Sequence, residues 1–204
     1  VNVCPYCNRN YIHTVKSVND KSTRPQFDHF ICKKKHPIFA MSFYNLIPSC
    51  SICNSSIKGQ SQFHYETHIH PYFDDFIETI QFLKCEIKVE NGIYPKFKFY
   101  IEDLSTTKNY EYKVIRNHFE AMHLQTRYME QIVKEEFKRF RNEYVDKKSR
   151  TYDEISLNEI KRDIDKRIRG YQDENINNWE KVFWKSLKDS DDCLNLIVNK
   201  VIPI

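Results

Sequence analysis

Two periodicities of apolar residues divide this chain, a period of two in its middle and a helical period towards its end. Between residues 76 and 104 apolar and polar residues alternate, most clearly in the run 97–101, which is typical of a strand with one buried face. Asn91-Gly92 precedes that run, and Asn-Gly between alternating segments is a strong hairpin signal. We therefore expect a β-hairpin whose first side contains residues 80–83 and 87–89.

Beyond Thr106 apolar residues recur every three or four positions, and charged residues lie between them. This spacing predicts an amphipathic helix from Tyr110 to about Val145, continuous or broken once. The residues that set the period are Val114, His118, Met122, Tyr128, Ile132 and Phe137.

Two more helices are expected near the C-terminus. Ser156 followed by Glu159 is a capping box, which predicts a helix that ends near Gly170. A last helix is expected over 177–188. Its three large aromatic residues fit a core or a partner interface better than a base-stacking platform; they are Trp179, Phe183 and Trp184.

The first 60 residues contain two C-x2-C pairs, which indicate that this part of the mixed fold binds metal. A C-x2-C turn directs two sulfurs to one ion, so two such turns make a closed tetrahedral zinc site. The expected ligands are Cys4, Cys7, Cys50 and Cys53. Seven cysteines are an odd number, which excludes a complete disulfide framework. The other three are expected to be ordinary thiols; they are Cys32, Cys85 and Cys193.

Composition limits the class of protein. The formal charge is +4, which permits binding to polyanions without requiring it. No apolar run reaches the length of about 18 residues that a transmembrane helix needs, and no signal peptide is visible, so a cytoplasmic protein is expected. The chain begins at Val1, which leaves room for a natural start upstream.

Candidate catalytic residues lie between the two cysteine pairs and directly after the second pair. Asp28-His29 falls in a segment with the apolar and polar mix of a short strand. A histidine there can deprotonate water, and its neighbouring carboxylate can hold a hard cation that polarises a phosphate. Asn54 opens an expected helix, which would bring its carboxamide oxygen to the same cation as Asp28.

On these residues the chain resembles the HNH endonuclease superfamily, whose ββα-metal core has the pattern Asp-His, then Asn, then His or Asn after a C-x2-C knuckle. The resemblance implies that His29 is the general base and that Asp28 and Asn54 bind a catalytic divalent ion. It implies that Asn45 braces the loop that orients the histidine, and that the four paired cysteines hold structural zinc. Asn54 replaces the third histidine of the name, and an all-oxygen ligand set favours Mg²⁺ or Mn²⁺.

A narrower resemblance extends over the segments CPYCNRNYI, FDHFICKKKHPIFAMSFYNLIPSCSICNSSIKG and HPYFDDF. They are similar to HNH proteins of bacterial antiphage systems, notably the nuclease subunit of Septu-type systems. That resemblance implies an ATPase partner of the SMC or ABC type and the degradation of nucleic acid. It ends near residue 76, so we expect a nuclease core over 1–76 and a hairpin and helical region over 77–204 that provides a partner or substrate interface.

Three lysines are candidates for contact with substrate phosphates. Lys58 lies four residues after Asn54, although a solvated lysine at a helix end fits equally well. Lys33 and Lys34 follow the catalytic strand and can neutralise a nucleic-acid backbone, or form a solvated loop.

Three histidines offer a weaker hint of a second metal site. His64, His68 and His70 are close in sequence, but the helix that would align the first two is not assured. We favour the alternative, in which the segment 70–72 packs against the nuclease core or lines the substrate cleft.

Together these patterns predict an α+β protein with a zinc-stapled HNH core, a β-hairpin and a mainly helical C-terminal half. The expected reaction is phosphodiester hydrolysis of nucleic acid, with DNA favoured over RNA. Two alternatives stay open: an RNA nuclease, for example one acting on tRNA, and a non-catalytic zinc module that binds nucleic acid or a partner protein. The site grips phosphates rather than base edges, so the sequence does not decide between DNA and RNA.

Overall fold

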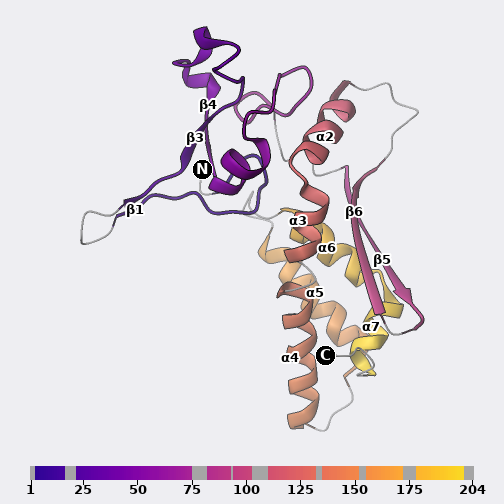
Figure 1. Ribbon diagram of the computed structural model, residues 1–204. Coiled ribbons are helices and arrows are strands. Elements are labelled where there is room, and N and C mark those ends of the chain that lie inside the picture. The colour runs from indigo at the N-terminus through magenta and orange to yellow at the C-terminus, as the bar shows by residue number, and fades with distance from the viewer. Residues whose placement is uncertain are drawn as a thin grey trace. The chain divides into compact units, whose positions relative to one another are not determined.

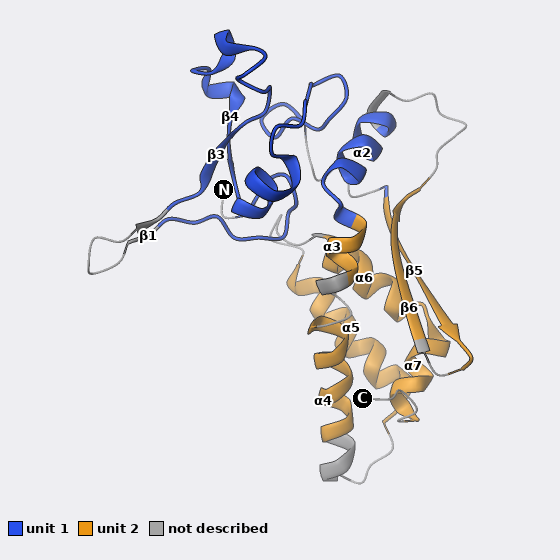
Figure 2. Cartoon of the chain, viewed as in Figure 1, with its two compact units in different colours: residues 1–82, 103–124 blue, residues 83–102, 125–204 orange. Residues whose placement is uncertain are grey.

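Helices and short antiparallel strand pairs make up the chain, which is therefore α+β as predicted (Figure 1). The computed structural model describes residues 3–16, 22–74, 82–92, 94–102, 110–131, 135–151, 155–171 and 178–199. The chain forms two compact units (Figure 2). The first unit contains residues 1–82 and 103–124, and the second contains 83–102 and 125–204. The first unit thus includes the whole expected nuclease core and, in addition, a helix from later in the chain.

The first unit is built on the antiparallel pair β3–β4, in which Asp28 lies opposite Ile47 and His29 opposite Leu46. A helix with wide, π-type turns follows, in which the Gly59 N–H donates to the carbonyl of Asn54. The elements are β1 (Val15–Lys16), β2 (Ser22–Thr23), β3 (Gln26–His29), η1 (Pro37–Phe39), η2 (Phe43–Asn45), β4 (Leu46–Ser49), η3 (Ile52–Lys58) and α2 (Tyr110–Ala121).

Helix α2 belongs to the first unit because its buried face contacts the N-terminal cysteine knuckle. The ring of His118 on α2 is buried, and its Nε2 lies 2.9 Å from the carbonyl oxygen of Tyr6. Tyr6 and Phe63 are also buried, and their rings meet edge to face at 6.0 Å. Burial lowers the pKa of His118 to about 4, so this histidine is neutral at pH 7 and packs as part of the core.

The predicted hairpin forms the sheet of the second unit. Asn91 and Gly92 both have positive φ, 52° and 67°, which the Asn-Gly pair tolerates better than other residues. Phe97 and Phe99 are buried, whereas Lys98 between them is exposed, as the alternation predicts. The strands are β5 (Leu83–Glu90) and β6 (Tyr94–Ile101). Residues 80 and 81 of the predicted first side lie outside the described residues.

The expected long helix is divided. It is interrupted at His123, whose φ of 51° is incompatible with a continuing right-handed helix. The next helix ends at Gln131, and residues 132–134 lie outside the described residues. The helices of the second unit are α3 (Leu124–Gln131), which begins at the boundary, α4 (Phe137–Thr151), α5 (Leu157–Gly170), α6 (Asn178–Lys188) and α7 (Asp191–Val198). Helix α7 was not predicted.

The aromatic residues of α6 lie in the core of the second unit. Trp179 stacks on Tyr128 with ring centroids 4.9 Å apart, and Phe183 meets Phe97 edge to face at 5.5 Å. Trp184 is fully buried as well. The prediction that these residues form core rather than a stacking platform is confirmed.

Helix α5 begins with the predicted cap. The Ser156 side chain accepts a hydrogen bond of 3.2 Å from the Glu159 N–H, one of the donors that a helix start leaves unpaired. The other end departs from the prediction. The helix stops at Gly170, but Gly170 does not have the positive φ of a glycine cap, and the Tyr171 N–H instead bonds the carbonyl of Ile168.

Replacing Ser156 with alanine is expected to lower the free energy of unfolding by about 1 kcal/mol, because the Glu159 N–H loses its partner. Urea unfolding measures this change. Asn158→Ala is the control, since Asn158 is exposed in the first turn of the same helix and does not cap it. Equal losses in both variants would contradict the capping role.

Candidate active site and metal centre

The two predicted cysteine pairs meet in the first unit. The four sulfur atoms lie within 4.8 Å of one another, and all four side chains are buried. Tetrahedral zinc with Zn–S bonds of about 2.3 Å needs sulfurs about 3.8 Å apart, so a small contraction completes the site. Cys4, Cys7, Cys50 and Cys53 can therefore bind a structural metal such as zinc.

Backbone turns direct each pair of sulfurs inward. In the first knuckle the Asn8 N–H donates to the carbonyl of Cys4 at 2.8 Å, and Asn8 adopts a positive φ of 48°. In the second knuckle the Cys53 N–H donates to the sulfur of Cys50 at 3.4 Å. The second knuckle joins the end of β4 to η3, so a bound metal would fix the strand pair and the helix to the N-terminal segment.

Two of the four thiols resist ionisation as long as no cation is bound. Contact with the thiol of Cys50, aided by burial, raises the pKa of Cys4, and contact with Cys4 does the same for Cys53. Hydrogen bonds from those two thiols lower the pKa of Cys50 to about 7. A dication would offset the repulsion among buried thiolates, which is the usual reason that such clusters bind metal. Of the remaining cysteines, Cys32 is half-buried, and Cys85 and Cys193 are buried in the second unit.

His29 ends strand β3 with its ring half-buried. Its Nε2 lies 3.1 Å from the carbonyl oxygen of Ala40. A carbonyl only accepts hydrogen bonds, so Nε2 carries the hydrogen and Nδ1 is left as a proton acceptor. This arrangement is what a general base requires.

Asn45 holds the loop that contains Ala40. Its Oδ1 accepts from the Ile31 N–H at 2.7 Å, and its Nδ2 donates to the carbonyls of Ile31 and Phe39 at 3.1 and 3.0 Å. All polar atoms of this buried amide thus have partners. Because Phe39 directly precedes Ala40, the amide fixes the carbonyl that faces His29, which is the kind of contact expected of Asn45.

Asp28 is paired with a lysine inside the first unit. Its Oδ2 accepts from the Tyr6 hydroxyl at 2.6 Å and lies 3.0 Å from the Nζ of Lys58. That Nζ also donates to the carbonyl of His29 at 2.8 Å. The two side chains of the ion pair are only 4% and 1% exposed. Lys58 therefore points into the unit, and a contact with a substrate phosphate would require it to leave Asp28.

Asn54 has a different partner. Its Nδ2 donates to the Oε1 of Gln26 at 3.1 Å, whereas the Asp28 carboxylate faces Tyr6 and Lys58. The carboxylate and carboxamide oxygens of Asp28 and Asn54 fit Mg²⁺ or Mn²⁺ in chemical type. A cation bound to Asp28 would stand beside the Lys58 ammonium or replace it.

Of the three histidines after the second knuckle, His68 and His70 pack against aromatic rings, whereas His64 is exposed. Among the residues that the structure describes, the four cysteines form the only group of three or more His, Cys, Asp or Glu side chains that could hold one metal ion, so these histidines form no second site of that kind. His70 is buried edge to face against Phe30 at 4.4 Å, and the Tyr72 hydroxyl donates to the carbonyl of Leu46. His68 stacks on Phe63, and burial lowers its pKa to about 4. His70 thus packs inside the first unit, which fits the first of the two placements expected for segment 70–72; the second, in a substrate cleft, stays a prediction.

Two parts of the site were missed from sequence. Tyr6 lies between the first two cysteines, where it resembles any spacer residue of a knuckle. Ala40 acts through its backbone carbonyl, so its residue type gives no signal in the sequence. Lys33 and Lys34 are exposed in the loop that follows β3.

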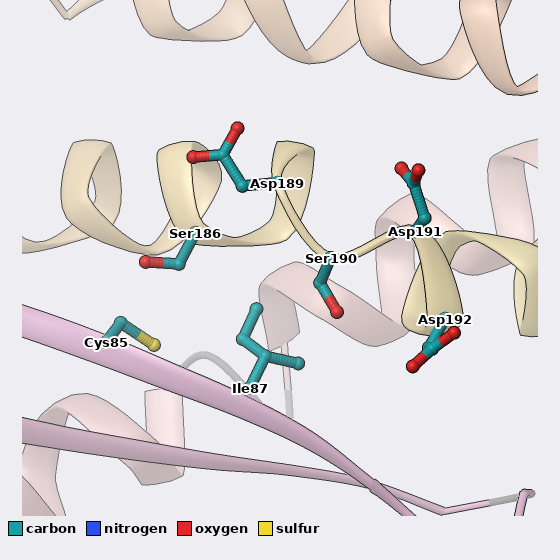
Figure 3. A pocket seen from close by; sticks show the side chains of 7 residues that line it. All are labelled: Cys85, Ile87, Ser186, Asp189, Ser190, Asp191 and Asp192. Atoms are coloured by element: carbon teal, nitrogen blue, oxygen red, sulfur yellow. The ribbon is translucent and has the colours of Figure 1, made fainter.

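The second unit contains a pocket of about 540 Å³ with an acidic lining. Figure 3 shows the side chains of Cys85 and Ile87 on one side and the turn between α6 and α7 on the other. Three carboxylates line it, namely Asp189, Asp191 and Asp192. This charge disfavours a phosphate, and Asp191 already pairs with Lys161 at 2.6 Å.

Comparison with known proteins adds one relative. No family model and no solved structure matches the chain. Protein Ea31 of Escherichia phage lambda is 28% identical over 128 residues, which are 61% of this chain and 39% of Ea31. The name Ea31 states no activity. Among the described residues, no helix has both the length and the apolar character needed to span a membrane.

Proposed function

We propose that this protein is a metal-dependent HNH endonuclease that hydrolyses phosphodiester bonds of nucleic acid, with DNA favoured as substrate. The observation that carries the proposal is the chain of contacts from Asn45 through the 39–40 backbone to the ring of His29. An imidazole whose Nε2–H is held by a carbonyl keeps its Nδ1 as the proton acceptor, which is suited to deprotonate a water molecule.

The chain's own groups would act on the attacking water. His29 Nδ1 takes a proton from the water, and the resulting imidazolium is stabilised by its Nε2–H bond to the carbonyl of Ala40. Because Asn45 fixes that carbonyl, the ring does not have to reorient during the reaction. The exposed Lys33 and Lys34 lie on the same loop and would neutralise substrate phosphates.

Two metals belong to the proposal. Zinc on the four clustered cysteines would fasten the strand pair, η3 and the N-terminal segment together. Asp28 and Asn54 would hold a divalent ion, which would supply charge stabilisation at the phosphate and the leaving oxygen. The antiphage role and the ATPase partner rest on the resemblance of the three segments CPYCNRNYI, FDHFICKKKHPIFAMSFYNLIPSCSICNSSIKG and HPYFDDF. A cytoplasmic location is proposed from the amino-acid sequence alone.

One observation favours a second candidate function. The Lys58 ammonium already neutralises Asp28, so the same fold is complete without a divalent cation at that carboxylate. A non-catalytic zinc module that binds nucleic acid or a partner protein would look the same.

His29→Ala is expected to reduce metal-dependent cleavage by roughly 100- to 10,000-fold, the range lost with a general base. Cleavage of plasmid DNA and of a matched RNA is measured with Mg²⁺, with Mn²⁺ and with chelator. His13→Ala is the control, because His13 is an exposed histidine of the same unit, outside the site. Zinc content and thermal unfolding are measured on every sample, so that loss of structural zinc is not mistaken for loss of catalysis.

Full activity of His29→Ala would refute the proposed base. Cleavage of RNA but not DNA would assign the RNA nuclease alternative. Absence of cleavage of either substrate by zinc-loaded wild-type protein, in all metal conditions, would favour the binding module.

A further inference from the structure

The loop between β3 and β4 exposes large apolar side chains to solvent. Ile38, Met41 and Phe43 are 85%, 87% and 86% exposed, and Tyr44 of the same loop is mostly exposed as well. Phe73, in the turn after His70, is also mostly exposed and lies beside Tyr44. Isolated exposed apolar residues are ordinary, but a run of them in one loop is typical of a contact surface. Figure 1 shows this loop beyond the ends of the two strands. We call these five residues the aromatic loop surface.

The aromatic loop surface is held in place by its backbone. The carbonyls of Phe39 and Ala40 bond Asn45 and His29, between the exposed Ile38 and Met41. Tyr44 and Phe73 lie with ring centroids 5.5 Å apart, which ties the loop to the turn after His70. A surface that is already ordered loses little conformational entropy on binding.

Two features of the loop indicate what binds there. The carbonyl of Ala40 is 3.1 Å from the ring of His29, so a molecule that reaches the catalytic histidine also meets residues on either side of Ala40. The same loop begins with three exposed lysines, which favours a polyanion over an uncharged or cationic partner; they are Lys33, Lys34 and Lys35.

We propose that the aromatic loop surface binds unpaired bases of a nucleic-acid strand while the adjacent lysines contact its phosphates. This inference rests on the proposed function and specifies its substrate class. Every base has a π-face on which an aromatic ring can stack, but that face is accessible only when the base is unpaired. Apolar and aromatic side chains offer nothing to the phosphates of an intact duplex, so the surface favours a single strand or an opened segment.

The test uses His29→Ala protein, which retains the surface, and fluorescent oligonucleotides in single-stranded and duplex form. Adding Phe73→Ala or Tyr44→Ala is expected to weaken single-strand binding roughly 5- to 100-fold, the loss of one base-aromatic stack, and to leave duplex binding little changed. Tyr100→Ala is the matched control, because Tyr100 is an exposed tyrosine of β6 in the second unit.

Salt dependence separates stacking from charge. Phe73→Ala should keep the slope of log affinity against log salt, whereas Lys34→Gln should reduce that slope by about 0.7, the contribution of one phosphate contact on a single strand. Single-strand affinities equal to those of the control would overturn the inference, even if wild-type protein cleaves. Absence of binding and cleavage with every nucleic acid would overturn both the inference and the proposed function.

Discussion

Cys50→Ser is expected to unfold the first unit. Structural zinc supplies about 10–16 kcal/mol of apparent binding free energy in small zinc domains, and that energy is folding energy because the unfolded chain has no formed site. A typical domain is stable by only about 5–15 kcal/mol, so losing one of four ligands removes much or all of the margin. Cys50 also links β4, the strand paired with the one that carries Asp28 and His29, to η3, which carries Asn54.

The effect is measured on the full chain by its zinc content, its circular dichroism and the rate at which protease cuts within residues 1–82. Cys32→Ser is the matched control, since Cys32 is a half-buried cysteine of the same unit outside the cluster. It should keep its zinc and its resistance to protease. A Cys50→Ser protein with unchanged unfolding temperature and protease resistance would show that the cluster is not a structural metal site.

Lys58→Met is expected to lower the free energy of unfolding by about 3–5 kcal/mol. The substitution removes a cation from a buried ion pair and leaves the Asp28 carboxylate unpaired, and that uncompensated charge is the main cost. The double variant Asp28→Asn, Lys58→Met should recover part of the loss, because no buried charge is left.

Urea unfolding of the wild type, both single variants and the double variant completes the thermodynamic cycle. Lys84→Met is the control, since Lys84 forms an exposed pair with Glu102 that should contribute less than about 1 kcal/mol. Additive losses at Asp28 and Lys58 would show that the two groups do not interact in solution.

Features with a local physical cause were predictable from sequence. The Asn91-Gly92 turn follows from the tolerance of these two residues for positive φ, and the Ser156 cap follows from an unpaired N–H three residues later. The cysteine cluster involves distant residues, yet C-x2-C spacing is specific enough to predict it. The start of the first hairpin strand was not predicted, because weak periodicity does not fix where an element begins. Helix α7 was not predicted either.

By itself, the sequence determined the α+β class, the four clustered cysteines and the strand that carries Asp28 and His29. Only the tertiary structure decided the surroundings of these two residues. Lys58 lies 30 positions from Asp28, and its inward turn depends on a buried carboxylate that it neutralises. The partner of His29 is a backbone carbonyl at Ala40, which every residue type possesses. Contacts of this kind depend on how the loop folds in space, so they cannot be predicted from the types of the two residues alone.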